Sequence, residues 1–246
     1  MTQKSKRYYP AFLDLTGRTV IVVGSGRPAE RKARQMAKYG AIVVLITPSP
    51  SVAILQSQVE GLLDVEQRSY VRGDLEGASL VFCLDPDEET RKAVAAEARA
   101  VGCPVNVAGE PDLTSFMVPG VVHREPLQIA ISTSGVAPQL AKHLRRSLAQ
   151  QFGEEWGAYT RLLAGVRAIA MARLDSADAV DEVLAAAIAS DLLERVRKDA
   201  APSADEAYEE FAPPASEDDA ADDADAPPAA EDDDADAADD PAGEGS

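Results

Sequence analysis

The chain has 246 residues, with 42 Asp and Glu against 24 Lys and Arg, and a formal net charge of −18. This excess is confined to residues 204–246, which hold 18 acidic residues and no basic one, so the other 24 acidic residues match the 24 basic ones. The negative charge of this segment would repel the phosphates of a nucleic acid. The segment also has too few apolar residues to offset the entropy cost of folding, so we expect residues 201–246 to be a disordered acidic tail. No run of 18 apolar residues indicates a membrane span and no signal-peptide core follows the basic start, so we expect a cytoplasmic protein.

The first elements of the chain are a buried strand, a glycine turn and a helix. Residues 20–33 read VIVVGSGRPAERKA, with the glycines and a small residue in the spacing Gly24-x-Gly26-x-x-Ala29. Gly24 allows a tight turn, Gly26 lets the backbone approach a pyrophosphate, and Ala29 lets the helix pack closely on the strand. A second apolar strand follows at residues 41–46, the spacing of a βαβ unit. The pattern favours a dinucleotide-binding turn over a glycine turn that merely joins two elements.

Strand and helix patterns alternate up to about residue 110. The next expected elements, a strand, a helix and a strand, are residues 79–84, 88–101 and 104–107. Alternation at these lengths predicts an α/β fold with a Rossmann-like open parallel sheet. Cys83 and Cys103 lie within or beside strand-like runs, and we expect two small buried thiols, not a disulfide.

The pattern changes after residue 115. A hairpin of two strands, a basic amphipathic helix and a long helical stretch are expected at residues 115–122, 127–132, 139–152 and 154–198. We therefore predict a nucleotide-binding domain, a β-hairpin and helix segment, and a helical segment. Their boundaries are residues 1–114, 115–152 and 153–200, with the tail at 201–246.

Several runs resemble the siroheme-synthase N-terminal family. They are YPAFLDL at 9–15, ERKA at 30–33, VNV at 105–107, SFMVP at 115–119 and, most specific, IAISTSGVAPQLA at 129–141. Members of this family are precorrin-2 dehydrogenases and often also sirohydrochlorin ferrochelatases. The resemblance implies NAD-dependent oxidation of precorrin-2 to sirohydrochlorin in siroheme biosynthesis. It also implies a homodimer, with much of the interface formed by the middle segment.

The resemblance also implies which residues contact NAD. The glycine turn and the loop after the second strand supply Gly24, Gly26, Arg27, Pro28, Thr47, Pro48 and Ser49. That second strand ends without an Asp or Glu to bind a ribose hydroxyl, and without an Arg to bind a 2′-phosphate. The preference for NAD over NADP therefore rests on the resemblance.

The implied substrate is a macrocycle with eight carboxylates, which basic side chains suit because guanidinium groups pair with carboxylates. The candidate substrate-binding residues are Ser132, Ser134, Arg124, Lys142 and Arg145, with His143 and Arg146 nearby. For the basic residues of the helix, a solvated helix face is the alternative.

The sequence departs from the family at two positions. The family carries an aspartate just after the Asn-Val strand, and Gly109 stands there in this chain. Glu110 and Asp112 are the nearest carboxylates and are our candidate catalytic residues, because removing a proton from the substrate requires an acceptor. A solvated turn residue is the alternative for Glu110. Some members have a serine before the proline of the Ser-Thr-Ser-Gly loop, where this chain has Ala137.

Metal ligands are not indicated, because His123 and His143 lack ligand spacing and two cysteines alone make no zinc site. Chelation would then depend on the four nitrogens of the substrate. Two other functions stay open. A non-catalytic module that binds NAD(H) or a tetrapyrrole is favoured by the missing aspartate and disfavoured by the retained loop at 132–138. A chelatase without dehydrogenase activity is disfavoured by the intact glycine turn.

Overall fold

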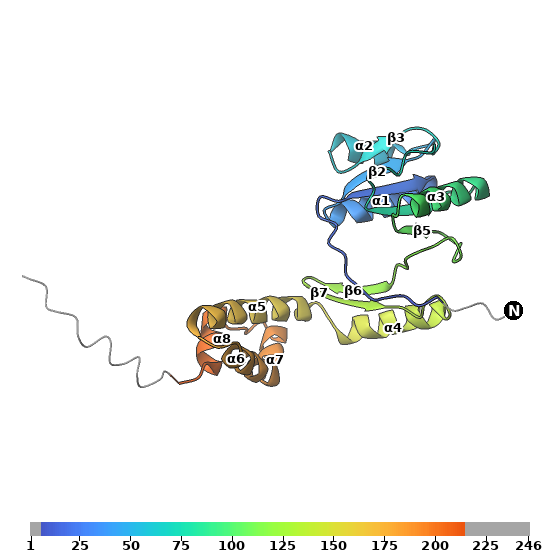
Figure 1. The fold of residues 1–246 in the computed structure, drawn as a ribbon. Coiled ribbons are helices and arrows are strands. Elements are labelled where there is room, and N and C mark those ends of the chain that lie inside the picture. Colours follow the sequence, from blue (N-terminus) through green and yellow to red (C-terminus); the bar gives the residue numbers. More distant parts are fainter. Residues whose placement is uncertain (1–5, 215–246) are drawn as a thin grey trace, which may run out of the picture. The chain divides into compact units, whose positions relative to one another are not determined.

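The computed structural model describes residues 6–214, which form two compact units (Figure 1). The first contains the residues up to His123 together with Gln128–Gly153, and the second contains Arg124–Leu127 and the residues from Glu154 onward. Between residues 6 and 214, no helix is long and apolar enough to cross a membrane. The predicted tail from residue 215 lies outside the described residues.

A five-stranded sheet in the order β3-β2-β1-β4-β5, with every pair parallel, forms the centre of the first unit. This confirms the predicted Rossmann-like α/β fold. The chain builds the sheet outward from β1 on one side and then crosses to β4 on the other. Open parallel sheets bind ligands at such a reversal, beyond the carboxyl ends of the two central strands. The strands are β1 (Thr19–Gly24), β2 (Ile42–Ile46), β3 (Asp64–Glu66), β4 (Leu80–Leu84) and β5 (Val105–Val107).

Helices cover both faces of the sheet, because β1 is apolar on both of its faces. Val20 and Val22 pack into one core with α1 (Gly26–Lys38) and α2 (Val52–Val59). Ile21 and Val23 pack into the other core with α3 (Glu88–Ala100). Buried strands of this kind read as continuous apolar runs instead of alternating ones, which is why the sequence shows them clearly. As predicted, Cys83 and Cys103 are free thiols in the α3 core, and burial raises the pKa of the Cys83 thiol to about 11.

Glu97 of α3 ties the irregular segment before β4 to the sheet. Its buried carboxylate accepts hydrogen bonds from the Tyr70 hydroxyl and from the N–H groups of Gly73 (3.0 Å) and Leu75 (2.9 Å). Burial alone would raise the pKa of Glu97, but these three donors outweigh it and lower the pKa. The ionised carboxylate therefore stabilises the folded state.

Side chains close the outer edge of β5. The N–H of Val105 donates to Ser115 Oγ (2.8 Å), and its C=O accepts from the N–H of Ser115 (2.8 Å). Thr114 Oγ1 accepts from the N–H of Val107 (3.0 Å) and donates to its C=O (3.1 Å). These bonds take up residues 114 and 115, so the strand predicted from residue 115 begins only at Gly120.

The predicted hairpin and helix follow the sheet, but the first strand of the hairpin covers residues 120–124 instead of 115–122. Strands β6 (Gly120–Arg124) and β7 (Leu127–Ile131) form a two-stranded sheet, joined through a cis Glu125–Pro126 bond. Helix α4 (Pro138–Gln151) starts one residue earlier than expected, with Pro138 in its first turn, where proline is tolerated. No residue of α4 is buried in the described part of the chain.

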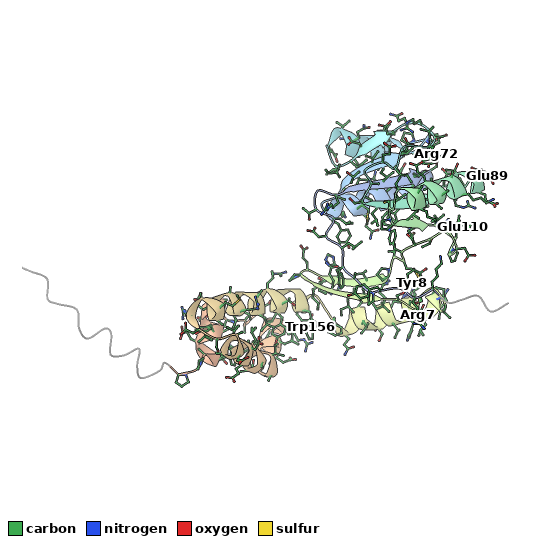
Figure 2. The ribbon with its side chains drawn as sticks, in the orientation of Figure 1. Arg7, Tyr8, Arg72, Glu89, Glu110 and Trp156 are labelled. Atoms are coloured by element: carbon green, nitrogen blue, oxygen red, sulfur yellow. The ribbon has the colours of Figure 1, made fainter. Side chains whose placement is uncertain are left out.

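The second unit is helical, as predicted for residues 154–198. Its helices are α5 (Glu155–Arg173), α6 (Ala177–Ala189), α7 (Leu192–Arg197) and α8 (Ala204–Phe211). They enclose a core of their own, centred on Val166, Val183 and Leu192. Trp156 packs against this core with its ring edge-on to Tyr159, at 5.8 Å between centroids (Figure 2).

Helix α8 corrects the prediction of disorder, which was wrong for residues 204–211. Ser203 and Glu206 form a capping box that satisfies the first turn of the helix. Ala207 and Tyr208 are buried in the core of the second unit, and the Arg173 guanidinium lies 5.0 Å from the centroid of the Tyr208 ring. The acidic composition of the whole segment hid these local signals.

Candidate functional site

Gly24 brings the carboxyl ends of β1 and β4 together. Its φ is +144°, and a Cβ placed on it would lie 2.6 Å from the carbonyl carbon of Leu84 and 2.9 Å from the backbone nitrogen of Asp85. These atoms belong to the backbone and cannot swing away, so no side chain fits at this position. The turn therefore depends on glycine for its close approach to β4.

Gly26 opens the amino end of α1 to the outside. Its φ is +72°, and among the described residues a Cβ placed on it would meet only Pro28 Cδ, at 3.9 Å. The N-cap residue Ser25 makes no side-chain capping bond, and the first turn holds no acidic residue. Arg27 and Pro28 are exposed. The first N–H groups of the helix therefore point to a space that an anion can occupy, and the helix dipole favours it there.

Thr47 adds a buried hydroxyl at the same edge of the sheet, directly after β2. The residue is 1% exposed, and its N–H donates to Glu66 O (3.0 Å). Its Oγ1 has no hydrogen-bond partner within the described part of the chain. Buried hydroxyls are normally paired, so this atom is a candidate to bind a ligand. Pro48 and Ser49 follow it and are exposed.

Glu30 fixes this loop to α1, a role that we did not predict. Its buried carboxylate accepts from the N–H of Ser51 (2.9 Å) and from Ser51 Oγ (2.8 Å). Ser51 Oγ in turn accepts from the N–H of Ile54 and caps α2. The sequence signals were a glutamate one turn into α1 and a serine that precedes a helix. One side chain of α1, the helix that follows the glycine turn, thus holds the end of the loop after β2.

The candidate carboxylates follow β5, at the same carboxyl edge, and Glu110 is labelled in Figure 2. Glu110 forms an ion pair with Arg91 of α3, at 3.2 Å between Oε1 and Nη2. Asp112 is exposed, and its backbone C=O accepts from Lys6 Nζ (3.2 Å). Gly109, where the family carries aspartate, has a φ of +78°, and a Cβ placed on it would meet no atom of residues 6–214 within 4 Å. The loop therefore has room for a side chain but a backbone conformation that favours glycine.

A pocket of about 250 Å³ lies between the segment before β6, the β7–α4 loop and α4. Three of the candidate substrate-binding residues, Ser132, Lys142 and Arg145, line this pocket together. Ser134 has a φ of +53°, and its N–H donates to Ser132 Oγ (3.0 Å), so it shapes the loop without lining the pocket. Arg124 belongs to the second unit, where it pairs with Glu154 at 3.3 Å.

Two family models match consecutive segments of the chain. Residues 11–120 match the family model of an NAD(P)-binding domain, and residues 124–151 match that of the central domain of sirohaem biosynthesis proteins. The chain is 36% identical to the siroheme synthase of Stutzerimonas stutzeri over 166 residues, which cover 68% of this chain and 36% of that protein. It is 38% identical to siroheme synthase 1 of Halorhodospira halophila over 167 residues, covering 65% of this chain and 34% of that protein.

A solved structure extends the match. The structure of SirC, a precorrin-2 dehydrogenase, superposes with a TM-score of 0.68 and 26% identity, covering 83% of this chain and 98% of that one. The fold and the glycine edge thus define a Rossmann-type NAD(P)-binding protein. More narrowly, the chain is similar in sequence to siroheme synthases and in fold to a precorrin-2 dehydrogenase. It spans about a third of the length of the siroheme synthases that it matches.

Residues 6–214 contain no group of three or more His, Cys, Asp or Glu side chains placed to hold a metal ion. His143 is exposed on α4, and His123 is exposed on β6.

Proposed function

We propose that the protein oxidises precorrin-2 to sirohydrochlorin with NAD as the hydride acceptor. The observation that carries this proposal is the edge formed by Gly24, Gly26 and the unpaired Thr47 hydroxyl, in a chain whose fold resembles that of a precorrin-2 dehydrogenase. The substrate loses a hydride and a proton, and NAD becomes NADH.

The glycine turn and the Thr47 loop would hold the two ends of the cofactor. Gly24, Gly26, Arg27 and Pro28 surround the open amino end of α1, which suits the pyrophosphate. The adenosine half would lie along the loop after β2, with Thr47 Oγ1 gaining a hydrogen-bond partner and Pro48 and Ser49 exposed beside it. When bound, NAD supplies the site that accepts the hydride.

The substrate would be held by its carboxylates. Lys142 and Arg145 place two positive charges in the pocket, and the Ser132 hydroxyl adds a hydrogen-bonding group. Ser134 and Arg124 remain candidates, Ser134 because it shapes the loop and Arg124 because it can pair with carboxylates. Glu110 or Asp112 would accept the proton that the substrate loses.

We also propose that the protein is a cytoplasmic homodimer. In the described part of the chain, helix α4 has no buried residue, and its apolar side chains Leu140 and Leu144 are 49% and 39% exposed. Apolar side chains on an uncovered helix are typical of a surface that pairs with another subunit. Light scattering of the wild type against Leu144→Glu tests this, and a monomeric wild type would refute it.

The central test is anaerobic incubation with precorrin-2 and NAD. We expect the absorption spectrum of sirohydrochlorin to appear together with an equal amount of NADH. Whichever of Glu110→Gln and Asp112→Asn slows turnover about a hundredfold, the usual effect of losing a general base, identifies the carboxylate that accepts the proton. Absence of NADH with folded protein and intact substrate would refute the proposal. Adding ferrous iron afterwards tests the chelatase activity that the family resemblance implies.

A further inference from the structure

Arg91 connects three segments at the carboxyl edge of the sheet. Arg91 is the fourth residue of α3. Its guanidinium extends back over the β4–α3 loop, where Nη1 donates to Pro86 O (2.6 Å) and Asp85 O (3.2 Å). Nη2 donates to Glu110 Oε1 (3.2 Å), on the loop after β5. The Arg91 side chain is only 17% exposed, so most of it is shielded from solvent.

The loop that Arg91 holds is the one against which the glycine turn packs. The backbone at Gly24 lies so close to Leu84 and Asp85 that no Cβ would fit. Arg91 binds the C=O of that same Asp85. A continuous chain of contacts therefore runs from Gly24 through Asp85 and Arg91 to Glu110, and it sets the distance between the glycine turn and the carboxylate.

The ion pair leaves part of the Glu110 carboxylate available. Only Oε1 is bonded to Arg91, and Oε2 makes no hydrogen bond to any residue between 6 and 214. The side chain is 38% exposed, so a substrate can reach it. Fixing one oxygen restricts the rotation of the carboxylate and gives the other oxygen a defined direction.

We propose that Arg91 is a positioning residue for the dehydrogenation, acting through Glu110; this rests on the function proposed above. A planar guanidinium is suited to the role because its two arms bind groups on different loops at once. A lysine ammonium at this position keeps the charge but cannot span the loop carbonyls and the carboxylate with fixed geometry.

The test uses kinetics in a double-mutant cycle. Because small displacements of a reacting group cost large factors in rate, Arg91→Met should lower kcat roughly tenfold to a hundredfold while KM for both substrates changes by less than about twofold. Arg91→Lys should restore part of that loss. In a Glu110→Gln background, Arg91→Met should change kcat by less than about twofold, because its partner is already removed. Arg99→Ala, an exposed arginine on the same helix, is the control and should leave kcat unchanged.

Amide hydrogen exchange of the NAD-free protein gives a second readout, independent of catalysis. Exchange in residues 109–113 should rise in Arg91→Met and stay unchanged in Arg99→Ala. Unchanged exchange, or a full additional loss of kcat in the Glu110→Gln background, would overturn the inference while leaving the proposed function intact. A folded wild type without dehydrogenase activity would overturn the proposed function and the catalytic part of this inference, whereas the exchange result would still show whether Arg91 holds the loop.

Discussion

Removing the unpaired hydroxyl of Thr47 should raise the stability of the NAD-free protein and lower its affinity for NAD. Valine has nearly the shape of threonine, so Thr47→Val removes the hydroxyl and keeps the packing of a residue that is 1% exposed. A buried polar group without a partner costs about 1–3 kcal/mol, and we expect the NAD-free protein to gain about 1 kcal/mol of stability. For a protein of this size that corresponds to roughly 2–4 °C in Tm.

NAD binding should change in the other direction. If Thr47 Oγ1 bonds the cofactor, its loss should cost about 0.5–1.5 kcal/mol of binding free energy, or roughly threefold to tenfold in Kd. Calorimetric titration measures this affinity. Thermal unfolding of the first unit is best followed by circular dichroism, because the single tryptophan of the chain, Trp156, lies in the second unit.

Thr114 supplies a matched control in the same unit. It is also buried, but its hydroxyl is bonded to both backbone groups of Val107. Thr114→Val should therefore lower stability by about 1–3 kcal/mol, because it leaves the Val107 N–H buried and unpaired. If Thr47→Val destabilises the NAD-free protein as much as Thr114→Val does, the Thr47 hydroxyl has a partner and the reasoning fails.

Four further predictions concern single residues. Tyr208→Ala should destabilise the second unit by about 3 kcal/mol, as expected for a buried aromatic residue, and urea unfolding followed by Trp156 fluorescence measures it; a change below about 1 kcal/mol would mean that α8 is not docked. Gly26→Ala should weaken NAD binding in titrations at a stability cost of about 1–3 kcal/mol from the positive φ, and unchanged affinity would refute the assignment of this turn. Glu97→Gln should reduce the loss of stability in acid. Because the pKa of Glu97 is lowered in the folded state, its ionised carboxylate stabilises the fold fully above the ordinary pKa of 4.5, and this stabilisation is lost as the pH falls through the lowered pKa. If urea titrations show the same loss of stability below pH 4.5 in the variant and the wild type, this prediction is contradicted. Gly109→Asp, which restores the family residue, should cost about 1 kcal/mol in urea unfolding because φ is +78°, and a gain would show that the loop adapts.

The sequence predicted most reliably what depends on neighbouring residues. The strand, the turn and the helix around Gly24 and Gly26 follow from local spacing, and both glycines have the unusual φ values that their roles require. It predicted poorly what depends on distant side chains. The bonds from Glu30 to Ser51 and from Arg91 to Glu110 join residues 21 and 19 positions apart, which no local pattern reveals.

The prediction of disorder failed at helix α8 for a different reason. The prediction of disorder averaged composition over residues 201–246, where acidic residues dominate. Folding of a short helix depends instead on a few positions, here the cap at Ser203 and the buried ring of Tyr208. The two aromatic residues of this segment, Tyr208 and Phe211, were the signal that set its first part apart from the rest.

The edge of β5 has a consequence for assembly. An exposed edge strand offers a row of unpaired N–H and C=O groups, onto which a strand from another molecule can add. Here the outward groups of Val105 and Val107 are all bonded, to Ser115 and Thr114 of the same chain. Sheets of two copies therefore cannot merge into one continuous sheet through this side, and the molecule resists fibre-like growth there without a sixth strand or a covering helix.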